Sequence, residues 1–108
     1  MIGQRLSSAS RHLDTVVVAA RYTPDGSLDI AQAYERLGSV WTDIVLLNRR
    51  AVIERLRAGK RLAIGQPVAV PGDYSVRERL ELARRNGTDV IRRAGSDAAS
   101  DELGVPVF

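Results

Sequence analysis

Two short turn signals, one in each half of the chain, constrain the fold more than any other feature. Asp25-Gly26 follows an apolar, β-branched stretch that runs from Val16 to Tyr22, and Asn86-Gly87 lies inside a second segment of alternating character. Dipeptides of this kind adopt the positive φ angles of tight hairpin turns, which pair the segments on either side. The pattern therefore predicts two antiparallel hairpins and a chain built mainly of β-strands.

The second arm of the first hairpin, Leu28–Leu37, carries signals for two structures. As a helix it would have Asp29 as its N-cap, Gln32 three residues later and Gly38 just beyond its end. As a strand it would complete the hairpin. We favour the strand, because a tight Asp-Gly turn connects nothing unless both of its arms pair.

The segment before the second turn, Val76–Asn86, is open in the same way. Ser75 and Glu78 have the spacing of a capping box, which favours a helix. We favour a hairpin here too, because the turn would place an apolar pair between two cross-strand ion pairs. The pairs expected are Arg84 with Asp89, Leu82 with Ile91 and Glu81 with Arg92.

A helix is predicted over residues 49–58. Asn48 is a favourable N-cap, and Gly59 stands where a helix commonly ends in a left-handed residue. Val52, Ile53 and Leu56 form the apolar stripe that such a helix would bury.

Further strands are predicted at residues 39–47 and 61–70, the latter with a break at Gly65 and Pro67. The predicted order of elements is that of an OB-like barrel: three strands, one helix, and two or three more strands. The predicted fold is therefore mainly β (α+β): a small OB-like or SH3-like barrel of five to six strands, with a simple α+β sheet as the alternative. Residues 1–13 would form an N-terminal extension or short helix, 14–94 the domain, and 95–108 an acidic spacer and an apolar tail.

Several classes of function are disfavoured by what the chain lacks. It has no cysteine and a single histidine, so disulfides, thiolate chemistry and histidine-based metal cages are excluded. No glycine-rich phosphate-binding motif is present, and no apolar run approaches the length of a membrane span. We expect a cytoplasmic protein that is not an enzyme, holds no cofactor or metal ion and does not associate with a membrane.

Positive charge is concentrated in the middle of the chain. The net charge is only +3, yet residues 49–61 hold six basic residues and one acidic residue. Such density is typical of a surface that binds nucleic-acid phosphates, although a solvated helix face gives the same pattern. We predict a nucleic-acid-binding module whose phosphate contacts come from Arg50, Arg55, Arg57, Lys60 and Arg61, extended by Arg84, Arg92 and Arg93.

An aromatic pair would complete this predicted surface. If Leu37-Gly38 is a two-residue turn, Tyr34 faces Trp41 on the neighbouring strand, beside Arg36. Flat rings next to a cation are what the stacking of nucleic-acid bases requires. Packing of the same pair in the core is the alternative.

The last residues suggest the alternative function. Acidic residues lead into an apolar tail formed by Leu103, Val105, Val107 and Phe108. This end resembles the C-terminal tails of bacterial single-stranded-DNA-binding proteins, which recruit partners with acidic residues and a terminal phenylalanine, although here a valine separates the proline from the phenylalanine. The alternative is thus an assembly subunit that docks a protein partner or a second copy through this tail or a sheet edge. The tail could also form a last strand on the protein's own sheet or on a sister subunit.

Overall fold

The computed structural model describes residues 13–37, 40–67 and 74–108. These residues form one helix, α1 (Arg49–Arg57), and seven strands: β1 (Thr15–Tyr22), β2 (Leu28–Leu37), β3 (Val40–Trp41), β4 (Val45–Asn48), β5 (Leu62–Pro67), β6 (Tyr74–Arg85) and β7 (Thr88–Arg93). Residues 1–12 of the predicted N-terminal extension and residues 68–70 of the predicted strand 61–70 lie outside the described residues.

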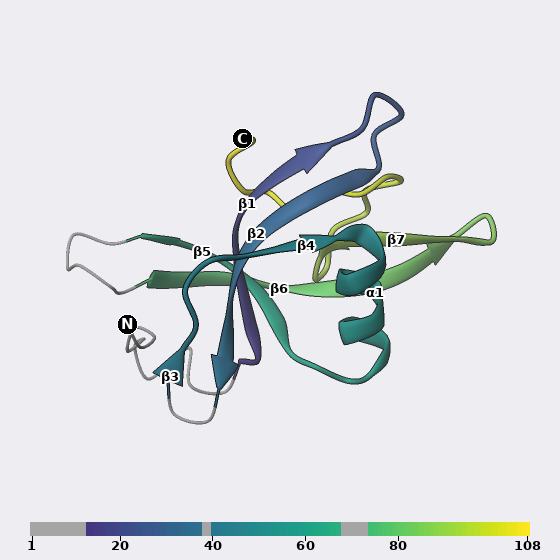
Figure 1. Cartoon of the computed structure of the whole chain (residues 1–108). Helices are drawn as coiled ribbons and strands as arrows, with labels where there is room; N and C mark the ends of the chain where they lie inside the picture. Colours follow the sequence, from purple (N-terminus) through teal and green to yellow (C-terminus); the bar gives the residue numbers. More distant parts are fainter. Residues whose placement is uncertain (1–12, 38–39, 68–73) are drawn as a thin grey trace.

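The strands form one mixed sheet in the order β3-β2-β1-β5-β6-β7, and β4 pairs with β2 beside this path (Figure 1). β1 and β5 are parallel, and every other pairing is antiparallel. The mainly β prediction is confirmed. The path of strands described here is open and does not close into the predicted barrel.

Both predicted hairpins are present. β1 pairs with β2 across the turn that contains Gly26, whose φ is 89°. β6 pairs with β7 across Asn86 and Gly87, whose φ angles of 52° and 78° are both positive, as a type I′ turn requires. The register of this second hairpin is the predicted one: Arg84 with Asp89, Leu82 with Ile91 and Glu81 with Arg92.

The single strand predicted over residues 39–47 is wrong, because the structure has two short strands there. Leu37 pairs with Val40 and Arg36 pairs with Trp41, so Tyr34 and Trp41 are not the predicted partners. The chain then leaves the ladder at Thr42, whose hydroxyl accepts a hydrogen bond of 3.0 Å from the backbone N–H of Glu35. This side chain takes the place of a strand partner. The side chain of Trp41 lies outside the described part of the structure.

Helix α1 begins and ends as predicted. The Asn48 side chain accepts a hydrogen bond of 2.9 Å from the backbone N–H of Ala51, and Gly59 has a φ of 81° just beyond the helix. Val52 and Ile53 are buried and Leu56 is partly buried, so the predicted stripe packs against the sheet. The helix thereby fixes the direction of the charged side chains on its other faces.

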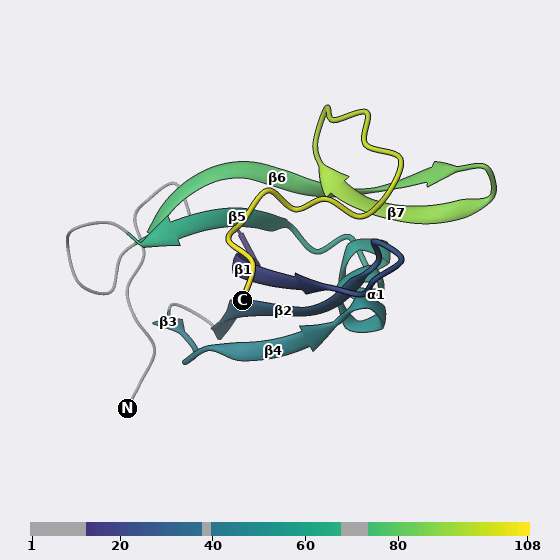
Figure 2. The same cartoon turned by 90° about the horizontal axis from the view of Figure 1, so that it is seen from above.

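The C-terminal tail packs on the body of the protein between β1 and β7 (Figure 2). Glu102 N–H donates to the carbonyl of Ile91, and Ala20 N–H donates to the carbonyl of Pro106, each at 2.8–2.9 Å. Leu103 is fully buried in the main core cluster, together with Val17, Ile64 and Ile91. The tail is therefore part of the folded core.

We expect Leu103→Ala to lower the free energy of unfolding by about 2–5 kcal/mol, because it removes a fully buried side chain from the core. Val107→Ala is the matched control in the same tail, and since Val107 is 70% exposed it should change stability by less than about 0.5 kcal/mol. Urea denaturation of the two variants measures both values. Equal effects would show that the tail does not pack as described.

Candidate functional site

The predicted basic face consists largely of ion pairs. Eight arginines of the described residues lie within 4 Å of a carboxylate of the same chain: Arg36, Arg49, Arg55, Arg57, Arg61, Arg84, Arg92 and Arg93. Of the nine cations predicted for the nucleic-acid surface, Arg36 and the extension Arg84, Arg92 and Arg93 included, seven are among them. Positive charge that is dense in the sequence is thus mostly matched by negative charge in space.

Helix α1 is connected to the sheet by two of these pairs. Arg55 Nε donates to Glu35 on β2 at 2.5 Å, while Arg57 donates to Asp89 on β7. Arg84 of β6 approaches the same Asp89 at 3.8 Å, as the predicted hairpin register implied. The helix thus uses two of its arginines to contact opposite parts of the sheet.

Arg36 and Arg61 share one carboxylate. Asp14 lies 3.5 Å from Arg36 Nη2 and 3.7 Å from Arg61 Nε, and it also accepts a hydrogen bond of 2.7 Å from the backbone N–H of Arg61. That backbone hydrogen bond, helped by the positive charges of Arg61, Lys60 and Arg36, outweighs partial burial and lowers the pKa of Asp14. Asp14 therefore stays ionised and neutralises part of the predicted face.

The acidic end of the chain folds back onto two more arginines. Asp101 is buried and accepts from Arg49 Nε at 2.7 Å, and Glu102 accepts from Arg93 Nη2 at 2.7 Å. Gly104, with a φ of 72°, lets the tail pass close to Arg93, because a Cβ at this position would lie 2.9 Å from Arg93 Cδ. Two acidic residues of the predicted spacer, Asp101 and Glu102, therefore form ion pairs with arginines of the domain.

Two of the predicted cations, Arg50 and Lys60, are exposed and make no ion pair within the described residues. They lie at opposite ends of helix α1 and line separate hollows: Arg50 lies near Arg57 and Asp89, and Lys60 near Arg55 and Glu35. The structure therefore does not bring all the predicted phosphate ligands together on one unpaired surface.

The predicted docking residues of the tail have different surroundings. Leu103 is in the core and Val105 is partly buried against it, whereas Val107 is 70% exposed. Phe108 lies under the guanidinium of Arg21, whose Cζ is 4.7 Å from the ring centroid, and its carbonyl accepts a hydrogen bond from Arg21 Nε. The terminal phenylalanine thus packs on its own chain.

Sequence reasoning missed the outer edge of β4. This strand pairs with β2 on one side, and no other described strand pairs with it (Figure 2). Val45 and Leu47 lie opposite Ala33 and Ala31 and pack toward the core. The sequence carries a signal for this edge, because Ile44–Asn48 is a run without charge, proline or glycine, but the prediction places most of this run in a single strand over residues 39–47.

Exposed apolar side chains lie along this edge. Leu46 is 64% exposed and Ile44 is 46% exposed, and both belong to the uncharged run. Natural edge strands usually carry a lysine, a proline or a bulge that prevents pairing with another chain. The edge of β4 lacks the first two, which makes it a surface able to accept a further strand.

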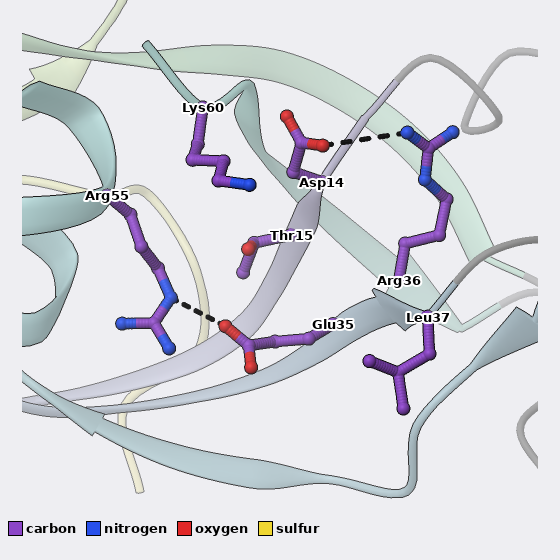
Figure 3. A pocket seen from close by; sticks show the side chains of 7 residues that line it. All are labelled: Asp14, Thr15, Glu35, Arg36, Leu37, Arg55 and Lys60. Atoms are coloured by element: carbon purple, nitrogen blue, oxygen red, sulfur yellow. Dashed lines mark hydrogen bonds and ion pairs between the residues drawn. The ribbon is translucent and has the colours of Figure 1, made fainter. Parts of the chain in front are cut away.

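A second candidate site is the cleft where β1, β2 and the end of α1 meet (Figure 3). Its volume is about 330 Å³, and its lining residues are Asp14, Thr15, Glu35, Arg36, Leu37, Arg55 and Lys60. Thr15 pairs directly with Glu35 in the β1–β2 ladder, and this register brings both side chains to the cleft. The predicted residues Arg36, Arg55 and Lys60 do gather here.

Thr15 is unusual among the lining residues of this cleft. The residue is only 2% exposed, and its hydroxyl has no hydrogen-bond partner among the described residues. Buried hydroxyls normally have a partner, and leaving one unsatisfied costs about 1–3 kcal/mol. The cleft thus contains a polar group whose hydrogen bond the described part of the chain does not supply.

Within the described residues, no three histidine, cysteine, aspartate or glutamate side chains are placed to hold a metal ion. The described residues also include no helix long and apolar enough to cross a membrane. Comparison with protein-family models, with curated proteins and with solved structures gave no match.

The pKa of Asp101 results from opposing effects. Burial raises it, but hydrogen bonds from Arg49 and from the backbone N–H groups of Leu28 and Ile91 prevail and hold the pKa below the ordinary aspartate value. A group whose pKa is lower in the folded than in the unfolded chain stabilises the fold above its unfolded pKa. That contribution is lost as the pH falls through its folded pKa.

We therefore expect the free energy of unfolding to decrease as the pH is lowered below about 5. Asp101→Asn should reduce this dependence and lower stability at neutral pH by about 3 kcal/mol, because it removes the carboxylate that pairs with Arg49. Urea denaturation across a pH series measures both effects. Asp97→Asn, at an exposed position without an ion pair in the described residues, is the control and should behave as the unaltered protein. Identical pH profiles for the two variants would contradict the assignment.

Proposed function

We propose that the chain is a non-enzymatic assembly module that pairs with a second copy of itself along the outer edge of β4, on the side opposite β2. The observation that carries this proposal is the uncharged outer edge itself: Leu46 is 64% exposed on β4, and β2 is the one described strand that pairs with β4. A strand added there would gain backbone hydrogen bonds and cover Ile44 and Leu46 together.

A second copy fits this edge because antiparallel pairing is self-complementary. If two β4 strands pair about a two-fold axis at Leu46, that residue faces its own counterpart and Ile44 faces Asn48. Such a contact uses the same surface on both partners and closes after two copies, as most homodimers do. Leucine beside leucine would form the apolar centre of the interface.

Charge at the two ends of the strand favours the same arrangement. Asp43 precedes the uncharged run and Arg50 follows it, and both are exposed without an ion pair within the described residues. In an antiparallel pair, the acidic end of one copy approaches the basic end of the other. A parallel arrangement would place like charges together, which costs free energy.

Nucleic-acid binding through Arg50, Arg55, Arg57, Lys60 and Arg61 stays a prediction. It draws support from the gathering of Arg36, Arg55 and Lys60 at one cleft. Phosphates would have to replace the carboxylates that Arg55, Arg57 and Arg61 now contact. For this reason we rank it behind assembly.

We expect the protein to show a concentration-dependent mass above the 11.8 kDa of one chain in sedimentation experiments. The association should be weak, because an interface made by one short strand falls below about 1,200 Å² of buried surface. Leu46→Lys should shift the protein to the monomer, since it places two ammonium groups opposite each other at the centre. Val107→Lys changes an equally exposed apolar residue in the tail and should leave the dimer intact.

The charged ends allow a sharper control. Asp43→Arg and Arg50→Asp should each weaken the dimer, because each brings like charges together at both ends of the interface. The double variant exchanges the two charges and should restore association. A protein that remains monomeric at every concentration, or a dimer unaffected by Leu46→Lys, would refute the proposal.

Nucleic-acid binding is tested separately by titrating a labelled oligonucleotide at several salt concentrations. If the basic residues contact phosphates, the affinity should fall steeply with salt, and Arg50→Glu with Arg57→Glu should weaken it without unfolding the chain. Both side chains lie off the buried stripe of α1. The absence of binding at low salt would end this candidate.

A further inference from the structure

We infer that the cleft between β1, β2 and the end of α1 binds a single phosphate group, with the Thr15 hydroxyl and the Lys60 ammonium as its ligands. This inference is independent of assembly along β4, because no residue of the cleft belongs to that strand. It also needs no extended nucleic-acid surface, since one phosphate group occupies one cleft.

Three hydrogen-bond donors converge on the cleft from different parts of the chain. Figure 3 shows the Thr15 hydroxyl pointing between the Lys60 ammonium and the Arg55 guanidinium. Arg55 uses Nε for Glu35 and Nη1 for the carbonyl of Ala51, so its Nη2 has no acceptor among the described residues. Donors that lack a protein acceptor are what a bound oxyanion would satisfy.

The local arrangement holds these donors in place. Gly59, with a φ of 81°, ends α1, and the backbone N–H of Lys60 then donates to the carbonyl of Arg55 at 3.0 Å. This hydrogen bond holds the backbone of Lys60 close to that of Arg55, so that both side chains can reach the cleft. Thr15 is fixed more firmly, because its strand pairs with β2 on one side and β5 on the other.

The charge of the cleft suits an anion that can also donate a proton. Its lining contains three cations, Arg36, Arg55 and Lys60, against the carboxylates of Asp14 and Glu35. Glu35 uses Oε1 for Arg55, which leaves Oε2 without a hydrogen-bond donor among the described residues. Inorganic phosphate keeps at least one O–H at neutral pH and can donate to it, whereas sulfate has no proton to donate. A phosphate monoester keeps its O–H only below its second pKa of about 6.

The test titrates inorganic phosphate into the full chain at constant ionic strength and follows binding by calorimetry and by the amide NMR signal of Thr15. We expect saturable binding that sulfate and chloride do not reproduce. Lys60→Gln and Thr15→Val should each weaken it by about fivefold or more, because each removes one donor. Thr15→Val keeps the shape of the side chain, so its melting temperature, which should not fall, reports that the fold is intact.

Arg79→Gln is the control for charge alone, since Arg79 is exposed on β6 and has no ion pair within the described residues. It should bind phosphate as the unaltered protein does. No saturable binding, equal binding of sulfate, or the same loss in Arg79→Gln as in Lys60→Gln would each overturn the inference. Repeating the titration with Leu46→Lys separates this site from assembly, because a monomer should bind phosphate unchanged.

A second arm identifies the source of the phosphate group. At a pH of about 5.5, where a monoester keeps one O–H, a nucleoside monophosphate and a 5′-phosphorylated oligonucleotide compete with inorganic phosphate if the cleft accepts a monoester, and an unphosphorylated oligonucleotide does not. Competition by the monoesters assigns the site to a terminal phosphate. Binding of inorganic phosphate alone assigns it to the free ion.

Discussion

One buried carboxylate connects the parts of this fold that are distant in sequence. Asp101 accepts hydrogen bonds from the backbone N–H of Leu28 at the start of β2, from that of Ile91 in β7, and from the Arg49 side chain at the first turn of α1. A carboxylate that receives several hydrogen bonds while it is shielded from water is strongly favoured in its charged form. The tail that carries Asp101 then places Leu103 in the core.

The same principle explains how a chain so rich in arginine can fold compactly. Three arginines of α1, Arg49, Arg55 and Arg57, each lie near a carboxylate from another part of the chain, so charge repulsion around the helix is reduced as the elements assemble. Several of these pairs are half-buried and fix orientation more than they add stability. Arginine density along the sequence is therefore a poor measure of the positive charge that a partner would encounter.

The sequence allowed prediction of those structures that depend only on residues close together in the chain. The hairpin at Asn86-Gly87 and the helix after Asn48 follow from turn and capping preferences of neighbouring residues, and both were found with the expected register and ends. The break at Thr42, the parallel pairing of β1 with β5 and the capture of Arg49 by Asp101 depend on residues far apart in the chain. The candidate sites depend on the same long-range contacts. Thr15 and Lys60 are distant in sequence, and the pairing of β4 with β2, the one partner it has among the described strands, is set by the fold as a whole.

The C-terminal tail covers the edges of some strands of this sheet but not the outer edge of β4. The tail covers the outer side of β7 at Glu102. It also covers β1 at Ala20, beyond the part of β1 that pairs with β5, where Val107 and Phe108 lie beside the strand. Covering an edge in this way protects it from pairing with other chains. The tail covers two strands in this way, whereas no described segment covers the outer edge of β4, an uncharged strand with an exposed leucine. That edge is therefore suited to a further strand. If that strand comes from a second copy, the paired β4 strands would join the two sheets into one. In each copy, the tail would still cover β7 and β1 of its own sheet, away from the interface.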